Sequence, residues 1–83
     1  MSTSSTSDEE QPFRIYTTAS LGHAIRHYRQ QAGLTQAELA ELVGIDRSYL
    51  SRLEKGEGTE QLRRVIVLLR RLGVRATLQH ADW

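Results

Sequence analysis

Two arginines and two serines are spaced so that they share one face of a short predicted helix over residues 47–55. Leu50 and Leu53 fall on the opposite side when successive residues are placed about 100° apart. Arginine is well suited to bidentate hydrogen bonds with guanine O6 and N7, and serine hydroxyls reach several bases or a phosphate. This helix can therefore pack through one face and contact DNA bases through the other. The residues on the contacting face are Arg47, Ser48, Ser51 and Arg52.

Metal, cofactor and catalytic chemistry have weaker support. His23 and His27 lie four residues apart on a predicted helix and could share a metal ion. The chain has no cysteine and no obvious third ligand, so an exposed polar helix face is the preferred interpretation. No nucleophile, base and oxyanion donor are spaced for catalysis, and no glycine-rich phosphate loop occurs. We therefore expect no metal site, no cofactor and no enzymatic activity.

A helix-turn-helix unit is predicted around the base-contacting residues. Thr35 and Glu38 form a capping box that begins a helix, which ends about two turns later at Gly44. Ile45 fills the turn, and Asp46 is a good N-cap for the next helix. Two short helices joined by such a turn place the second one in the major groove of DNA. The apolar residues of the first of them are Ala37, Leu39, Ala40, Leu42 and Val43.

The start of this first helix also offers a site for the DNA backbone. Thr35 and Gln36 lie where backbone N–H groups lack helical partners and where the helix dipole is positive. Both features favour a phosphate group. We therefore expect Thr35 and Gln36 to contact the backbone.

Two longer helices flank this unit. One runs from a cap at Thr18 or Ser20 to Gly33, and the other runs from Thr59 to Gly73. The apolar face of the first comprises Leu21, Ala24, Ile25, Tyr28 and Ala32. The predicted buried stripe of the second comprises Leu62, Val65, Ile66, Leu69 and Leu72. The opposite side of that helix is a solvated basic face with Arg63, Arg64, Arg70 and Arg71.

A strand is predicted over residues 74–79, where the apolar period changes to two. Val74, Ala76 and Leu78 share one side of it. A lone strand cannot pair its own backbone groups, so it needs a partner, either residues 13–16 or the same strand of a second subunit. We favour pairing across a dimer, which would place two recognition helices about 34 Å apart on a palindromic DNA site.

The chain of 83 residues has room for one small domain, whose stability is marginal unless a partner adds buried surface. Residues 1–12 are polar apart from Met1 and are expected to form a disordered tail. The remaining segments are a DNA-binding domain over residues 13–73, a dimerisation strand over 74–79 and a C-terminal tail over 80–83.

The charge of the chain agrees with a polyanionic partner. The net charge is +1, and without the three acidic residues at positions 8–10 the 10 acidic residues fall to 7 against 11 basic ones, a net charge of +4. No apolar run approaches the roughly 20 residues of a membrane span, and the first residues lack a signal-peptide pattern. The absence of cysteine fits a reducing compartment. We therefore expect no membrane contact and a cytoplasmic location at the bacterial nucleoid.

The stretch LTQAELAELVGIDRSYLSRLEKG, residues 34–56, resembles the Cro and phage-repressor type of helix-turn-helix family. The resemblance implies an all-α domain of four or five helices with a short C-terminal β-strand. The family's base-reading positions match Arg47, Ser48 and Arg52, with Ser51 as a further candidate. It also implies that Gln36 and Lys55 contact the DNA backbone, and that an ion pair between Arg29 and Glu54 ties the first helix to the recognition helix.

A narrower resemblance links the chain to the HipB-type antitoxins. It rests on RIYTTASLGHAIRHYRQQAGLTQAELAELVGI, on the fourth helix and on LGVRATL, together about residues 14–79. Such antitoxins pair with HipA-type serine/threonine kinase toxins, dimerise partly through a C-terminal strand and repress their own operon. The resemblance therefore implies a homodimeric, autoregulating repressor of a palindromic operator with a kinase toxin as partner. A stand-alone phage-like regulator without a toxin is the alternative.

The C-terminal residue bears on the toxin partner. Trp83 is either an exposed accident of the tail or an interface anchor, a role in which tryptophan is enriched. In the antitoxin interpretation it is the candidate toxin contact.

A third interpretation, a helix-turn-helix unit that binds only protein, would show no salt-sensitive affinity for DNA.

Overall fold

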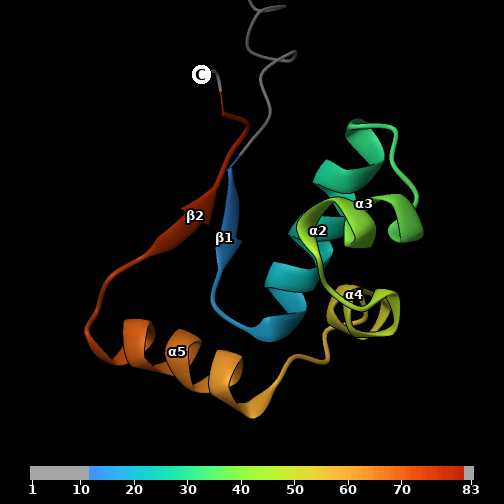
Figure 1. Cartoon of the computed structure of the whole chain (residues 1–83). Coiled ribbons are helices and arrows are strands. Elements are labelled where there is room, and N and C mark those ends of the chain that lie inside the picture. The colour runs from blue at the N-terminus through green and yellow to red at the C-terminus, as the bar shows by residue number, and fades with distance from the viewer. Residues whose placement is uncertain (1–11, 82–83) are drawn as a thin grey trace, which may run out of the picture.

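The computed structural model describes residues 12–81 of the chain (Figure 1). Within this range it has four helices and one two-stranded antiparallel sheet, in agreement with the predicted helical class with a short C-terminal strand. In chain order the elements are β1 (Phe13–Ile15), α2 (Thr18–Gln31), α3 (Gln36–Val43), α4 (Arg47–Glu54), α5 (Glu60–Arg71) and β2 (Ala76–Leu78). No helix of the described residues is long and apolar enough to span a membrane.

Helix α2 begins at a cap that differs from the prediction. Thr17, rather than Thr18 or Ser20, is the N-cap. Its hydroxyl accepts a hydrogen bond from the Ser20 N–H at 3.0 Å, and the Ser20 hydroxyl accepts one from the Thr17 N–H at 3.0 Å. Because each side chain satisfies the other residue's backbone group, the pair forms a capping box with Ser20 inside the helix.

The helix-turn-helix unit forms as its local residues predict. At the start of α3, the Thr35 hydroxyl accepts from the Glu38 N–H at 3.0 Å, and the Glu38 carboxylate accepts from the Thr35 N–H at 2.8 Å. Gly44 ends α3 with a φ of 77°, a left-handed conformation that favours glycine. Asp46 occupies the N-cap position of α4, although its side chain makes no capping hydrogen bond.

Helices α2 and α4 approach so closely that only glycine fits at one position of α2. A Cβ atom on Gly22 would lie 1.9 Å from the carbonyl oxygen of Leu53. The buried apolar side chains of the described residues are Ala24, Ala40, Leu50, Leu53 and Ile66. With so small a core, the close backbone approach between α2 and α4 is a main determinant of where α4 lies.

Strand β2 pairs with β1 of the same chain, in a register that joins Phe13 to Leu78. The Tyr28 hydroxyl of α2 donates to the Leu78 carbonyl oxygen at 3.2 Å, which docks the sheet on α2. Of the two predicted partners, the N-terminal segment is therefore the one found, and β2 is shorter than the predicted 74–79. Within the part of the chain that the structure describes, the sheet has two strands, so each strand keeps one unpaired edge. Pairing across a dimer stays a prediction.

The predicted buried stripe of α5 is only partly buried. Ile66 is buried, and Leu62 and Leu69 are half-buried. Val65 is 47% exposed and Leu72 is 67% exposed, contrary to the prediction. The physical reason is the position of α5, which packs against α2 and is set apart from α3 (Figure 1). One side of its apolar face therefore remains in solvent.

The apolar residues at the end of α3 are also exposed, with Leu42 72% exposed and Val43 58% exposed. Ile45 is 38% exposed, contrary to the prediction that it fills the turn. Within residues 12–81, α5 packs against α2 and leaves these side chains in solvent. The turn that precedes the recognition helix is therefore uncovered in the single chain.

Replacing Gly22 with alanine is expected to lower the free energy of unfolding by about 1–3 kcal/mol. The added methyl group would meet the Leu53 carbonyl oxygen, a backbone atom that cannot move aside as a flexible side chain does. The higher helix propensity of alanine offsets at most about 1 kcal/mol. Urea unfolding measures the change, with Gln30→Ala at an exposed position of α2 as the matched control. A Gly22→Ala protein as stable as this control would show that α2 and α4 separate without cost.

Candidate nucleic-acid interface

Helix α4 presents the predicted base-contacting residues on its outer side. The exposed or half-buried members of this set are Arg47, Ser48, Ser51 and Arg52. On the inner side, Leu50 is 2% exposed and Leu53 is 7% exposed. Two leucines therefore anchor the helix, while its polar face is open to a ligand.

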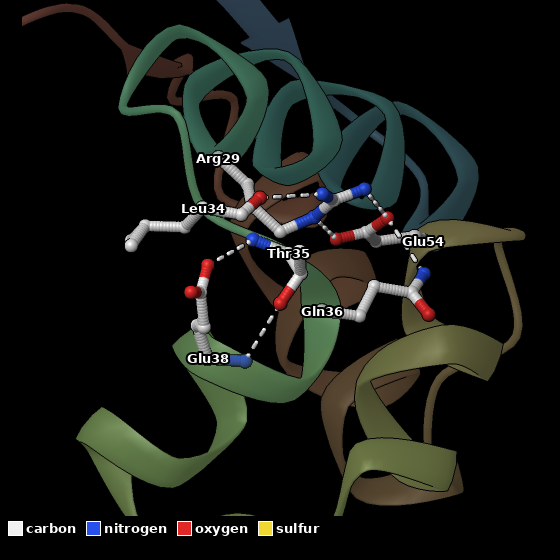
Figure 2. Close-up of polar contacts among 6 residues, drawn as sticks. All are labelled: Arg29, Leu34, Thr35, Gln36, Glu38 and Glu54. Carbon is white, nitrogen blue, oxygen red and sulfur yellow. Dashed lines mark hydrogen bonds and ion pairs between the residues drawn. The ribbon is translucent and has the colours of Figure 1, made fainter.

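A bidentate ion pair joins α2 to the end of α4 (Figure 2). The Nε and Nη2 atoms of Arg29 donate to the two carboxylate oxygens of Glu54 at 2.7 and 2.9 Å. The two side chains are 11% and 3% exposed, so the pair is largely removed from water. The Arg29 guanidinium holds the pKa of Glu54 below its usual value, although burial opposes this shift. The same hydrogen bonds raise the pKa of Arg29.

Two further contacts extend the pair into the helix-turn-helix unit. Arg29 Nη1 donates to the Leu34 carbonyl oxygen at 2.8 Å, and the Gln36 side-chain amide donates to Glu54 Oε1 at 3.0 Å. As Figure 2 shows, the network connects α2, the loop that follows it, the start of α3 and the end of α4. Arg29 and Glu54 therefore position the recognition helix.

A shallow hollow beside this network gathers basic and polar side chains from α2, α3 and the end of α4. It is lined by Arg26, Arg29, Gln36, Ser51, Glu54 and Lys55. Gln36 and Lys55, both predicted to contact the DNA backbone, thus line the same hollow. Arg26 was not predicted, although it lies one turn before Arg29 on the same helix, a spacing that puts both on one face. Three cationic side chains against one carboxylate make the hollow electropositive, which suits a phosphate.

Thr35 is less open to a phosphate than its place at the helix start predicts. Its N–H group and one acceptor site of its hydroxyl are used in the capping box with Glu38. The Glu38 carboxylate also brings negative charge to the start of α3 and repels an anion there. The Thr35 hydroxyl proton remains as a donor, so its backbone contact stays a prediction.

Arg63, Arg64 and Arg70 of α5 engage groups of their own chain. Arg63 and Arg64 pair with Glu60 at 2.6 and 2.9 Å, and these hydrogen bonds lower the pKa of Glu60 to about 2. Arg70 Nη1 lies 3.4 Å from the Tyr16 carbonyl oxygen. Exposed pairs of this kind contribute little stability, and they agree with the predicted solvated face.

The two neighbouring histidines of α2 lie beside an aromatic ring. The Phe13 ring centroid is 5.9 Å from that of His23 and 4.9 Å from that of His27. Across residues 12–81 there is no group of three or more side chains that could hold a metal ion. The histidines thus belong to the junction between β1 and α2.

The residues predicted to form a dimer contact differ in exposure. Val74 is 51% exposed, and Ala76 and Leu78 in β2 are half-buried. Trp83, the candidate toxin contact, lies outside the described residues.

Comparison with known proteins identifies relatives of the chain. The sequence matches the helix-turn-helix family over residues 25–79. An uncharacterized HTH-type transcriptional regulator, y4mF, of Sinorhizobium fredii is 37% identical over 60 residues, which are 72% of this chain and 79% of that protein. Antitoxin HipB of Escherichia coli K12 is 34% identical over 65 residues, which are 78% of this chain and 74% of that protein.

A solved structure is similar as well. The HipB–O4 20mer complex contains a chain that matches with a TM-score of 0.50 and 34% sequence identity, over 82% of this chain and 96% of that chain. The sequence and structure comparisons therefore agree with the resemblance found in the sequence.

Replacing one partner of the Arg29–Glu54 pair is expected to cost more stability than replacing both. Arg29→Met or Glu54→Gln alone leaves a buried charge without its partner, which costs roughly 3–5 kcal/mol at such sites, whereas the double variant leaves no lone charge. A double-mutant cycle by urea unfolding measures the coupling. A coupling energy near zero would contradict the positioning role of the pair.

The dependence of stability on pH provides a second test of the Arg29–Glu54 pair. Because the Glu54 pKa is lowered in the folded state, its stabilisation is present above the ordinary value of 4.5 and is lost as the pH falls through the folded-state value. The wild-type protein should therefore lose more stability than Glu54→Gln when the pH is lowered below that range. Equal losses in the two proteins would count against a stabilising pair.

Proposed function

The chain belongs to the Cro/C1-type helix-turn-helix family of DNA-binding transcriptional regulators, and on this basis we propose that it represses transcription by binding a specific operator. Its relatives are regulators and antitoxins rather than enzymes. The observation that carries the proposal is the exposed arginine and serine face of α4. Leu50, Leu53 and the buried Arg29–Glu54 pair hold this face outward.

The proposed DNA contacts fall into two sets. Base contacts come from the outer face of α4, where arginine guanidinium groups can form bidentate hydrogen bonds with guanine. Their residues are Arg47, Ser48, Ser51 and Arg52. Backbone contacts come from the electropositive hollow and the start of α3, through Thr35, Gln36, Lys55 and the newly found Arg26. One proton of the Gln36 amide is used by Glu54, which leaves the second for a phosphate.

We propose that the protein acts as a homodimer on a palindromic operator. Two-fold symmetry places two recognition helices on successive turns of the DNA major groove. The unpaired edge of β2 within residues 12–81 allows the sheets of two subunits to join. Val74, Ala76 and Leu78 would then line this contact.

The relatives named HipB support a more specific role. We propose that the chain is the antitoxin of a HipA-type serine/threonine kinase toxin, represses its own operon in the cytoplasm and contacts the toxin through Trp83. The relative from Sinorhizobium fredii, named as a transcriptional regulator, supports the alternative of a stand-alone regulator. A kinase gene beside this gene distinguishes the antitoxin from that alternative.

DNA affinity is expected to fall steeply with salt concentration. Each neutralised phosphate releases counterions, so the slope of log affinity against log salt approaches about −0.9 per backbone contact on duplex DNA. Fluorescence anisotropy with labelled duplex DNA measures this slope. An affinity unchanged between low and physiological salt would favour a helix-turn-helix unit that binds only protein.

Substitutions in the two contact sets are expected to act differently. Arg47→Ala and Arg52→Ala should each weaken operator binding by about 1–3 kcal/mol and reduce discrimination against other sequences. Arg26→Ala and Gln36→Ala should weaken binding to all duplexes by similar factors. Anisotropy measures affinity, and Arg63→Ala on the solvated face of α5 is the matched control. Unchanged operator binding by both α4 variants, with native circular dichroism, would place the reading face elsewhere.

A further inference from the structure

Helix α5 carries a row of exposed aliphatic side chains along one side. Val65, Leu68 and Leu72 are 47%, 57% and 67% exposed, and their spacing places them on one side of the helix. We call these three residues the α5 strip. Aliphatic side chains clustered in this way usually mark an interaction surface.

A second exposed aliphatic surface lies at the turn of the helix-turn-helix unit. Leu42, Val43 and Ile45 form it, at the end of α3 and in the turn before the recognition helix. We call these three residues the turn surface. Both surfaces consist of branched aliphatic side chains, so each can exclude water from the other.

The α5 strip is not positioned to cover the turn surface of its own chain. Ile66, 6% exposed, packs the other side of α5 into the core. The linker before α5 is also anchored, because the Thr18 hydroxyl donates to the Gly56 carbonyl oxygen at 2.9 Å and a Cβ on Gly56 would lie 3.2 Å from Ala19. Moving α5 onto its own turn would take Ile66 out of the core.

The charges beside the two surfaces are opposite. Arg71 lies three residues after Leu68, and Arg64, which pairs with Glu60, lies four residues before it, so both are beside the strip on the helix surface. Glu38 lies four residues before Leu42 and Glu41 lies directly before it. These three residues line one shallow depression. Two α5 strips packed on each other would bring arginines together, whereas a strip on a turn surface brings arginines to glutamates.

We propose that the α5 strip of one copy covers the turn surface of a second copy, and that the strip of the second copy covers the turn surface of the first. This inference deepens the proposed homodimer and rests on it. The turn that orients each recognition helix is then completed by the partner's α5. Dimerisation and DNA reading are thereby coupled, because a lone subunit leaves the turn before α4 uncovered.

A mixing experiment tests this arrangement. Leu42→Asp removes the turn surface and Leu68→Asp removes the strip, and both positions are exposed enough for the fold to tolerate the change. Each variant alone should dimerise at least about tenfold more weakly than the wild type, because both strip-on-turn contacts of its dimer are disrupted. An equimolar mixture should regain dimers, because the heterodimer keeps one intact strip on one intact turn surface. Sedimentation velocity without DNA measures association, and circular dichroism checks the fold.

Val67→Asp, on the basic side of α5, is the matched control and should leave the dimer unchanged. A Leu42→Asp protein that dimerises as the wild type does would overturn the proposal and leave the β2 edges, or a strip packed on a strip, as the dimer contact. A mixture no more dimeric than its components would overturn it as well. Because the assay contains no DNA, a failure of the proposed operator binding appears separately, in the anisotropy measurements.

Discussion

The Arg29–Glu54 ion pair is the contact on which the orientation of the recognition helix depends. Charges so far removed from water are stable only when they are paired and hydrogen-bonded. Here both carboxylate oxygens of Glu54 accept from the guanidinium, a third guanidinium donor reaches the Leu34 carbonyl oxygen, and Gln36 donates to the same carboxylate. A rotation of α4 away from α2 would break several of these bonds together, so α4 is held in one orientation.

This constraint acts on one side of the helix-turn-helix unit. On that side the backbone of α4 also meets Gly22 of α2, where no Cβ fits. On the other side Val43 and Ile45 face solvent, and the core of the described residues contains five buried apolar side chains. A domain of this size has little stability to spare. The uncovered side therefore gives the chain a physical reason to associate, and association would add support where the single chain lacks it.

Local features of this protein are determined by the sequence itself. The capping box of Thr35 and Glu38 and the left-handed Gly44 depend on residues a few positions apart, so the bounds of α3 were predictable. The division of α4 into a buried leucine side and an exposed arginine and serine side follows from helical spacing in the same way. The cap of α2 was predicted at Thr18 or Ser20 rather than at Thr17, because three nearby hydroxyl residues offer competing caps.

Contacts between distant segments were decided only by the tertiary structure. Periodicity identifies an apolar face of α5, but the packing of α5 against α2 determines that Ile66 is buried and Leu72 is exposed. The alternation in β2 predicts a strand, while the path of the chain selects β1 as its partner. Arg26 joins Lys55 at one hollow because α2 and α4 lie side by side, which no local spacing encodes. Sequence thus determines which residues form a helix face, and tertiary packing determines which element covers that face.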